Sequence, residues 1–339
     1  MRRSFTLVTE FILLGLSSIQ ELQILFFVLF FTIYMVTVAI NLGIIVLIGV
    51  NACLHAPMYF FLSHLSFMDL CFSSIVTPKM LGIFLSERKT ISYTACMVQC
   101  YFFLAFLHVE ICILAVMVFD QYMAICNPLL YGSRISKYVY VCTSLITVPY
   151  VYGALTGLME TLWTYNLAFS GRNEINHFYC ADPLLIRLVC SDTYKKELSM
   201  FVVAGFNFTC SLFIILISYI YIFPAMLRIR STEGKHKASL PGAPIWQLSV
   251  SSIQLFSSCI LDPLQKSLQQ GKMVAVLYTT VIPCWILSST TWGTRMWKKL
   301  WSKNRSAGNC FLLIDKFNAT VLKSFYFLQT TTSSYCFVQ

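Results

Sequence analysis

Three strongly polar side chains lie deep within long apolar stretches of the sequence, at Asn41, Asp69 and Glu110. A charge in hydrocarbon costs at least about 2.5–3.5 kcal/mol, so such residues usually face the interior of a helical bundle and have a partner there. We favour a polar or cation-binding cluster shared by three helices. A protonated carboxyl group in a structural hydrogen-bond network is the alternative.

A second set of residues has the character of a ligand-binding wall. It lies on the outer halves of two helices predicted near 96–121 and 198–226, and comprises Phe103, Leu104, Leu107, His108 and Phe206. Apolar walls with a few polar groups suit a small apolar ligand. For any single residue of the set, ordinary helix packing is the simpler interpretation.

Most of the 14 cysteines lie within apolar runs, where they act as small hydrophobic residues. A few stand where an oxidising compartment could reach them, among them Cys96 at the start of a predicted helix and Cys180 and Cys190 in a later loop. A bridge from that loop to the helix would stabilise the fold by roughly 2–4 kcal/mol. The spacing alone does not determine which cysteines pair.

The sequence lacks the residues that catalysis, phosphate binding or metal binding would need. The sequence has no loop with a nucleophile beside a base, no phosphate-binding glycine loop and no metal-ligand cluster, so we expect no enzyme, no cofactor and no metal. The formal net charge is +10, but no basic run is interleaved with stacking aromatic residues, so we expect no nucleic-acid partner. Basic residues that flank membrane spans serve topology and contacts with lipid headgroups.

The composition indicates a membrane protein. Of the residues, 58% are apolar and 11% are charged, against roughly 25% charged in soluble domains. A soluble protein with an unusually apolar core is disfavoured, because the apolar residues form long runs rather than helical stripes. Each run is long enough for a hydrocarbon core of roughly 30 Å at 1.5 Å per residue. The runs predict five helices near 23–50, 58–82, 96–121, 139–162 and 198–226.

Two further spans are expected near 238–261 and 273–294, the first rich in Ser and the second containing Pro283. The predicted fold is therefore an all-α membrane protein, a seven-transmembrane-helix bundle in which helices six and seven are atypical. An odd number of spans places the termini on opposite sides, and we expect the N-terminus outside. The apolar stretch at 11–16 is too short for a signal-peptide core, so we expect no cleaved leader. The receptor-like domain is predicted over 1–301, and 302–339 is expected to be a tail without a fold.

Several motifs match one known family almost residue by residue. They are Leu54-His-Ala-Pro57-Met-Tyr-Phe, Met117-Val-Phe-Asp120-Gln121-Tyr122, Asn173-Glu-Ile-Asn-His-Phe-Tyr-Cys180, Ala204-Gly-Phe-Asn207, Ser218-Tyr219 and Met226-Leu-Arg-Ile-Arg230. Over about 5–238 the chain resembles the odorant receptors of the rhodopsin-like, G-protein-coupled class.

The resemblance implies a multi-pass receptor in the plasma membrane. A small volatile odorant would bind between the third, fifth, sixth and seventh helices, against Phe103, Leu104, Leu107, His108, Phe206 and Asn207. Binding would favour an active state that engages a stimulatory heterotrimeric G protein. The resemblance also implies a Cys96–Cys180 bridge, an inner polar cluster of Asn41, Asp69 and Glu110, and G-protein coupling through Asp120, Gln121, Tyr122 and Tyr219.

The chain differs from the family at three positions where the family's own residue has a role, namely Gln121, Ser170 and Ser4. Gln121 stands where the family has an arginine that contacts the G protein, and glutamine lacks the permanent charge and the forked donors. Ser170 stands where the family has a cysteine that would pair with Cys190, and Ser4 stands where it has a glycosylated asparagine.

The C-terminal third departs most, and a displaced reading frame would explain it. Family-like codons for Phe-Pro-Thr-Trp-Cys-Ser-His-Leu-Ala, read one base later, encode Ser239 to Trp246 of this chain. A family-like ending, treated in the same way, gives Arg295 to Trp301. We therefore expect displaced stretches at about 239–270 and from 284 onward; an uninterrupted family frame in the gene would contradict this.

The sequence leaves three candidate functions. The first is an odorant receptor, and the second is a degenerate receptor product that inserts in the membrane, or is retained in the endoplasmic reticulum, without signalling. The third is a small-solute transporter, which needs broken helices in an inverted repeat that the sequence lacks. Odour-dependent cyclic AMP would separate the first from the second.

Overall fold

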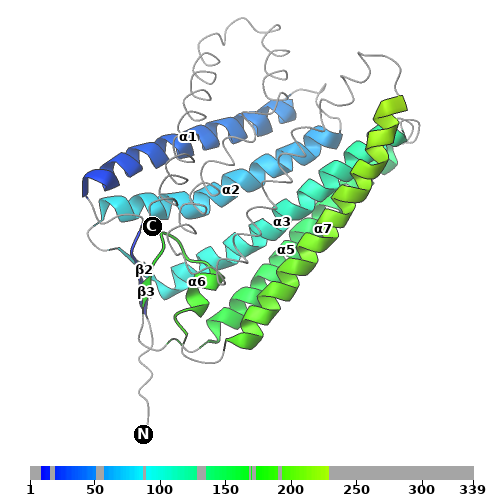
Figure 1. The fold of residues 1–339 in the computed structure, drawn as a ribbon. Coiled ribbons are helices and arrows are strands. Elements are labelled where there is room, and N and C mark those ends of the chain that lie inside the picture. Colours follow the sequence, from blue (N-terminus) through cyan, green and yellow to red (C-terminus); the bar gives the residue numbers. More distant parts are fainter. Residues whose placement is uncertain are drawn as a thin grey trace, which may run out of the picture.

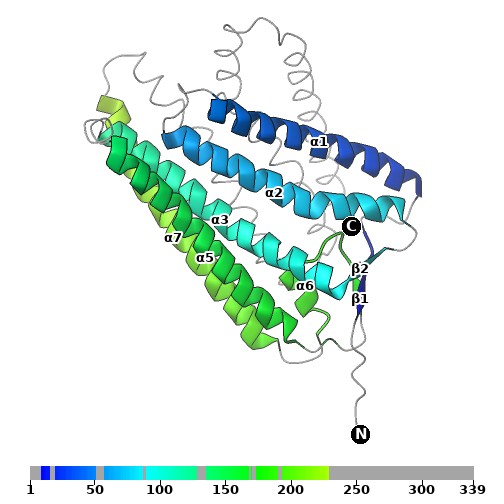
Figure 2. The same ribbon diagram turned by 180° about the vertical axis from the view of Figure 1, so that it is seen from behind.

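A computed structural model describes residues 9–15, 20–50, 57–86, 89–127, 135–167, 169, 173–189 and 193–228. Long helices lie side by side in the order α1, α2, α3 and then the pair α5 and α7 (Figures 1 and 2). The spans expected near 238–261 and 273–294, the tail at 302–339 and the displaced stretches lie outside the described residues.

The five helices expected in the first two-thirds of the chain are confirmed. They are α1 (Gln20–Val50), α2 (Pro57–Leu85), α3 (Tyr93–Cys126), α5 (Ile135–Tyr165) and α7 (Tyr194–Arg228). All are long and apolar enough to cross a membrane. They are helical because hydrocarbon offers backbone groups no partner, and a helix satisfies those groups within one segment.

Each helix is longer than the span predicted from the sequence. The predicted spans end near the first ionisable residue, whereas helices continue through the polar interface of a bilayer. At the start of α7, for example, Lys195, Lys196 and Glu197 lie in the first helical turns rather than in a loop. α3 begins where the Ser92 side chain accepts a hydrogen bond from the backbone N–H of Ala95 at 3.3 Å, as an N-cap does.

A small three-stranded sheet, which the sequence did not predict, covers one end of the bundle (Figure 1). β1 (Glu10–Leu13) lies in the middle, antiparallel to β2 (Thr90–Ser92) and parallel to β3 (Glu174–Ile175). Phe11 and Leu13 are fully buried beneath it. Strands of two to four residues are too short for their alternation to be recognised in a sequence.

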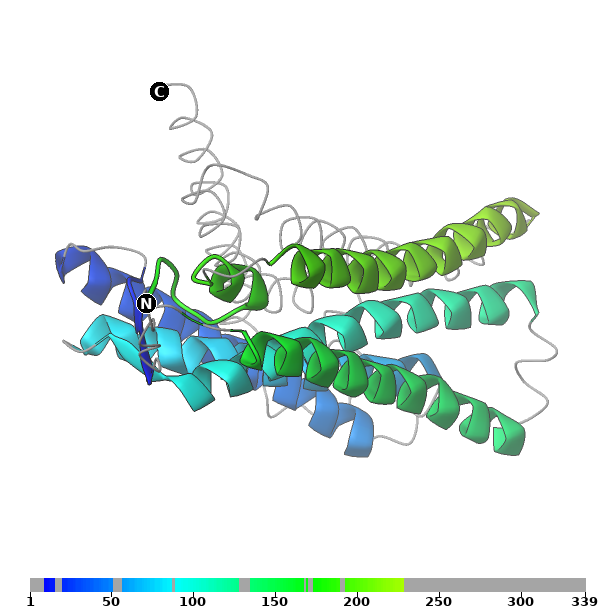
Figure 3. The same ribbon diagram turned by 90° about the horizontal axis from the view of Figure 1, so that it is seen from below.

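α3 is the central helix of the described bundle, because it packs against α2, α5 and α7. Viewed from below, α3 lies between α5 and α7 (Figure 3). Its contact with α5 depends on small residues: a Cβ atom added at Gly153 would lie 2.6 Å from the backbone oxygen of Ala105, and one at Gly157 would lie 3.0 Å from the Ala105 Cβ. Small residues of this kind allow membrane helices to approach closely.

Candidate functional site

A disulfide joins the loop between α5 and α7 to the start of α3. The bridge connects Cys96 and Cys180, whose Cα atoms are 5.5 Å apart and which are both fully buried. This confirms the pairing expected from the family resemblance. The loop that contains β3 and the short helix α6 (Asp182–Ile186) is therefore attached to the central helix.

Gln99 attaches the same loop a second time, a contact that was not predicted from the sequence. Its side-chain oxygen accepts a hydrogen bond from the backbone N–H of Cys180 at 2.9 Å, and its Nε2 donates to the backbone oxygen of Ile75 at 3.1 Å. The available signal was a glutamine within an apolar run, three residues after Cys96. Its two bonds connect the loop to both α2 and α3.

Most of the predicted ligand wall lies inside the bundle. Phe103 and Leu107 are buried, and Leu104 is partly buried. The Phe103 ring stacks on Tyr179 of the loop with 5.1 Å between centroids. Phe206 differs, because it is 64% exposed on α7, while its neighbour Asn207 is 3% exposed.

The two polar residues of the predicted site, His108 of α3 and Asn207 of α7, each have one hydrogen-bond partner on α3. His108 is 3% exposed, and its Nδ1 lies 2.7 Å from the backbone oxygen of Leu104. One turn further along, the Cys112 thiol donates to Oδ1 of Asn207 at 3.3 Å. Among the described residues, His108 Nε2 and Asn207 Nδ2 are buried and have no hydrogen-bond partner.

The predicted inner polar cluster is buried on three helices. Asn41 of α1 donates from Nδ2 to the backbone oxygen of Thr37 at 2.9 Å. Asp69 of α2 and Glu110 of α3 are close enough to interact electrostatically. Within the described part of the chain, the Oδ1 of Asn41 and the Oδ2 of Asp69 have no hydrogen-bond partner. The structure thus brings the two carboxyl groups together and places Asn41 on the neighbouring helix.

At the opposite end of α3 from the disulfide lie the residues predicted to couple to a G protein. Asp120 and Gln121 are buried, and Tyr219 packs partly buried against the main core. The Tyr122 ring lies 5.7 Å from the ring of Tyr221, so the ends of α3 and α7 are in contact.

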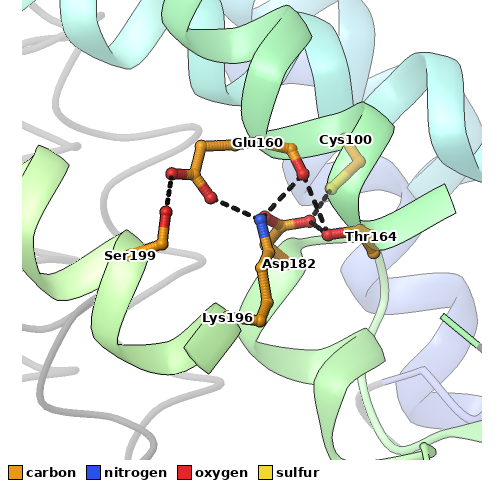
Figure 4. Close-up of polar contacts among 6 residues, drawn as sticks. All are labelled: Cys100, Glu160, Thr164, Asp182, Lys196 and Ser199. Carbon is orange, nitrogen blue, oxygen red and sulfur yellow. Dashed lines mark hydrogen bonds and ion pairs between the residues drawn. The ribbon is translucent and has the colours of Figure 1, made fainter. Parts of the chain in front are cut away.

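A buried ionic cluster, which was also not predicted from the sequence, joins α5, α6 and α7 (Figure 4). Lys196 of α7 forms ion pairs with the carboxylates of Glu160 and Asp182, the latter at 2.8 Å. Its Nζ also donates to the backbone oxygen of Glu160 at 2.7 Å, and Ser199 donates to Glu160 Oε1 at 2.8 Å. The three ionic side chains are at most 2% exposed.

Asp182 extends the ionic cluster to α3. Its Oδ1 accepts from the Thr164 hydroxyl at 2.7 Å and from the Cys100 thiol at 3.2 Å (Figure 4). A buried charge is tolerated only when it is paired and hydrogen-bonded, and all three ionic groups meet that condition. The sequence contained one hint: an acid near the end of one span and a lysine at the start of the next.

The part of the chain that the structure describes contains no group of three or more His, Cys, Asp or Glu residues arranged to hold a metal ion. Its chemistry is that of a helical bundle with an apolar interior, a covering loop fixed by a disulfide, and a few buried polar groups.

These features define a class of protein by fold. The structure superposes on squid rhodopsin with a TM-score of 0.56, at 16% sequence identity, over 85% of this chain and 82% of that one. At this identity the similarity establishes the fold alone, and that fold is the seven-helix bundle of rhodopsin-like receptors.

The sequence identifies the family within that class. The profile of the olfactory receptor family matches residues 30–279. Human olfactory receptor 5M8 is 72% identical over 284 residues, which cover 84% of this chain and 91% of that protein. Mouse olfactory receptor 5M5 is 59% identical over 284 residues, covering 84% and 89%. The chain belongs to the olfactory receptor family. It is therefore a multi-pass membrane protein of a receptor family, neither an enzyme nor a small-solute transporter.

Proposed function

We propose that this protein binds a small, apolar, volatile odorant between α3, α7 and the two later spans, beneath the loop that carries Cys180. The observation that supports this most directly is the stacking of Phe103 on Tyr179 under a loop that the disulfide holds in place. Buried apolar walls with a few polar groups are typical of small-molecule sites. Phe206, which is exposed in the described bundle, is the least supported member of the proposed wall.

Binding would activate a stimulatory heterotrimeric G protein at the end of the bundle that carries Asp120 and Tyr122. We further propose that the N-terminus and the disulfide lie outside the cell, in the plasma membrane. Disulfides persist in oxidising compartments, and β1 pairs with β2 just before the start of α3, where Cys96 forms its bridge to Cys180. A protease added to intact cells should therefore reach a tag fused before Met1.

A second candidate function is a receptor that inserts in the membrane without signalling, and Gln121 favours it. Gln121 is buried, and neither polar atom of its side-chain amide has a hydrogen-bond partner among the described residues. An arginine at this position would bring a permanent charge and five donors. Glutamine supplies neither the ion pair with Asp120 nor the charged contact with a G protein that the family resemblance implies.

The two candidates differ in an assay that measures surface exposure and cyclic AMP in the same cells. Odorant-dependent cyclic AMP would establish the first candidate and overturn the second. Surface-labelled, odorant-binding protein without cyclic AMP would establish the second. A direct activator of adenylyl cyclase is the control that the readout works.

If the receptor is silent, we expect Gln121→Arg alone to leave it silent. The arginine restores one contact, whereas the stretches at about 239–270 and from 284 onward also depart from the family. The measurement is odorant-dependent cyclic AMP at matched surface expression. Full recovery of signalling by this one substitution would show that the C-terminal departures matter little.

A further inference from the structure

The strand β1 connects two parts of the chain that do not pair with each other. In the sheet order β2-β1-β3, one neighbour is β2, which ends where α3 begins, and the other is β3 of the loop that carries Cys180. In the described sheet β2 and β3 each pair with β1 and not with each other. The strand β1 is therefore the link between the start of α3 and this covering loop.

Three other contacts fix the covering loop at Cys180 and just after it. The disulfide and the hydrogen bond from Gln99 both attach Cys180, and the ion pair with Lys196 attaches Asp182. Residues 173–177, which we call the upstream arm, precede those attachments in the chain. The disulfide therefore holds one part of the loop and leaves the position of the upstream arm to other contacts.

Backbone hydrogen bonds join the upstream arm to β1 and to the two residues that follow it. The N–H groups of Ile12, Leu14 and Gly15 donate to the backbone oxygens of the arm at positions 173, 175 and 177, at 2.7, 3.0 and 3.3 Å respectively. On the other side, the N–H of Leu13 donates to the backbone oxygen of Lys89, just before β2, at 2.8 Å. Successive N–H groups from Ile12 to Leu14 thus point alternately to the arm and to the β2 side, as in a strand with a neighbour on each side.

Two buried side chains hold β1 in this position. Phe11 and Leu13 are fully buried and belong to one small core together with both cysteines of the disulfide and Ile175 of the upstream arm. The Phe11 ring meets the ring of Phe169 edge to face, with 5.6 Å between centroids. Burial of apolar surface is the dominant favourable term in folding, so these two side chains are the residues of β1 on which its pairing depends most.

We propose that β1 is a strap that positions the upstream arm, and with it the cover of the odorant site, independently of the disulfide. The effect on a ligand rests on the proposed function, since Tyr179, which stacks on Phe103, lies two residues beyond the arm. When the strap is released, Cys180 stays bonded to Cys96 while residues 173–177 leave their place in the sheet. A ligand beneath the loop then exchanges faster with its surroundings.

The test compares Leu13→Ser with Leu14→Ser in the full-length receptor, purified in lipid nanodiscs. The two leucines are adjacent, but Leu13 is fully buried whereas Leu14 is 43% exposed. Amide hydrogen exchange reports the local opening of a segment. We expect Leu13→Ser to raise exchange in the upstream arm about tenfold or more, because a fully buried leucine loses both its burial and its packing. Leu14→Ser should change that exchange by less than about twofold.

Amides of α3 between residues 103 and 118 are the internal reference for this comparison. A general loss of stability would raise exchange there as well, whereas release of the strap alone should not. Leu13→Met keeps an apolar side chain of similar volume, so it should retain slow exchange in the upstream arm.

A second variant makes the opposite change and does not depend on Leu13→Ser being able to fold. Ile12 and Glu174 are Cα partners in the β1–β3 pair, so cysteines at both positions can form a disulfide that locks the strap. Exchange in the upstream arm should then fall below that of the variant with serines at both positions. Release of tritiated octanal, the probe ligand, should slow about fivefold or more, since release that requires opening slows when opening becomes rarer. Peptide mapping checks that Cys96 and Cys180 remain paired.

The outcomes separate the strap from the function that it would serve. Equal exchange in the arm for Leu13→Ser and Leu14→Ser, or for the locked and the serine variants, would show that β1 does not position the arm. If the arm responds as expected but octanal leaves every variant at the same rate, the strap does not control the odorant site, although odorant binding stands. If octanal does not bind even the wild-type receptor, the proposed function loses that support, while the exchange comparison still decides whether β1 is the strap.

Discussion

Lys196→Met is expected to destabilise the receptor by about 3–5 kcal/mol, the cost of removing one partner from a buried ionic cluster. Methionine matches the length of lysine but leaves Glu160 and Asp182 as two buried carboxyl groups without their cation. Because those residues lie on α5 and α6, the loss should loosen both the α5–α7 contact and the loop above α3. The measurement is the thermal unfolding midpoint of the purified protein, together with the fraction at the cell surface.

Lys195→Met is the matched control, since Lys195 is the adjacent residue on α7 and is exposed. It should unfold at nearly the wild-type temperature. The triple variant Lys196→Met, Glu160→Gln and Asp182→Asn removes every charge of the cluster and should recover part of the loss, because buried unpaired charge is the main cost. Equal stability of Lys196→Met and Lys195→Met would show that the cluster contributes nothing.

Gly153→Ala is expected to destabilise the bundle by about 1–3 kcal/mol, as overpacking of a close contact does. The new Cβ atom would lie 2.5 Å from Val109 Cγ2 and 2.6 Å from the backbone oxygen of Ala105. The Val109 side chain can rotate away from the new Cβ atom, but the backbone oxygen of Ala105 can move away only if α3 and α5 separate. The measurement is the thermal unfolding midpoint of the purified variant in detergent, compared with that of the wild-type protein.

Gly205→Ala provides the comparison within the same protein. Gly205 lies in the interior of α7, and nothing lies within 4 Å of an added Cβ atom there. Alanine is the better helix former by roughly 1 kcal/mol, so this variant should be neutral or slightly more stable. Adding Val109→Ala to Gly153→Ala should recover only part of the loss, because it removes one of the two clashes. An unchanged midpoint for Gly153→Ala would contradict the close contact.

The features that the sequence predicted correctly are those with a strong local signal. A run of some 20 apolar residues has few alternatives to a membrane helix, so α1 to α3, α5 and α7 were all expected. Their ends were less accurate, because the charges of Lys195 and Lys196 resemble the edge of a span. In the structure Lys196 is buried, because its carboxylate partners Glu160 and Asp182 lie on α5 and α6.

The features that the sequence did not predict depend on contacts between distant residues. The cluster joins Lys196 to an acid 36 residues earlier in the chain, and no local pattern marks such a pair. The same reasoning applies to Gln99, whose two partners lie on α2 and in the loop. The Cys96–Cys180 pairing came from the family motifs, since spacing left several pairings open. The proposed ligand wall illustrates the remaining difficulty: adjacent positions on α7 are about 100° apart, so Asn207 is buried and Phe206 is not.

The pairing of β1 also constrains how the receptor is synthesised. The side chain of Asn173, the residue before β3, donates a hydrogen bond to the backbone oxygen of Glu10 in β1, which lies 163 positions earlier in the chain. At about 5–20 residues per second, a ribosome needs roughly 10 to 30 s to make the intervening segment. During that interval β1 can pair with β2 but not with β3, so Phe11 and Leu13 receive their final cover only after the fourth span and the loop that follows it have been made.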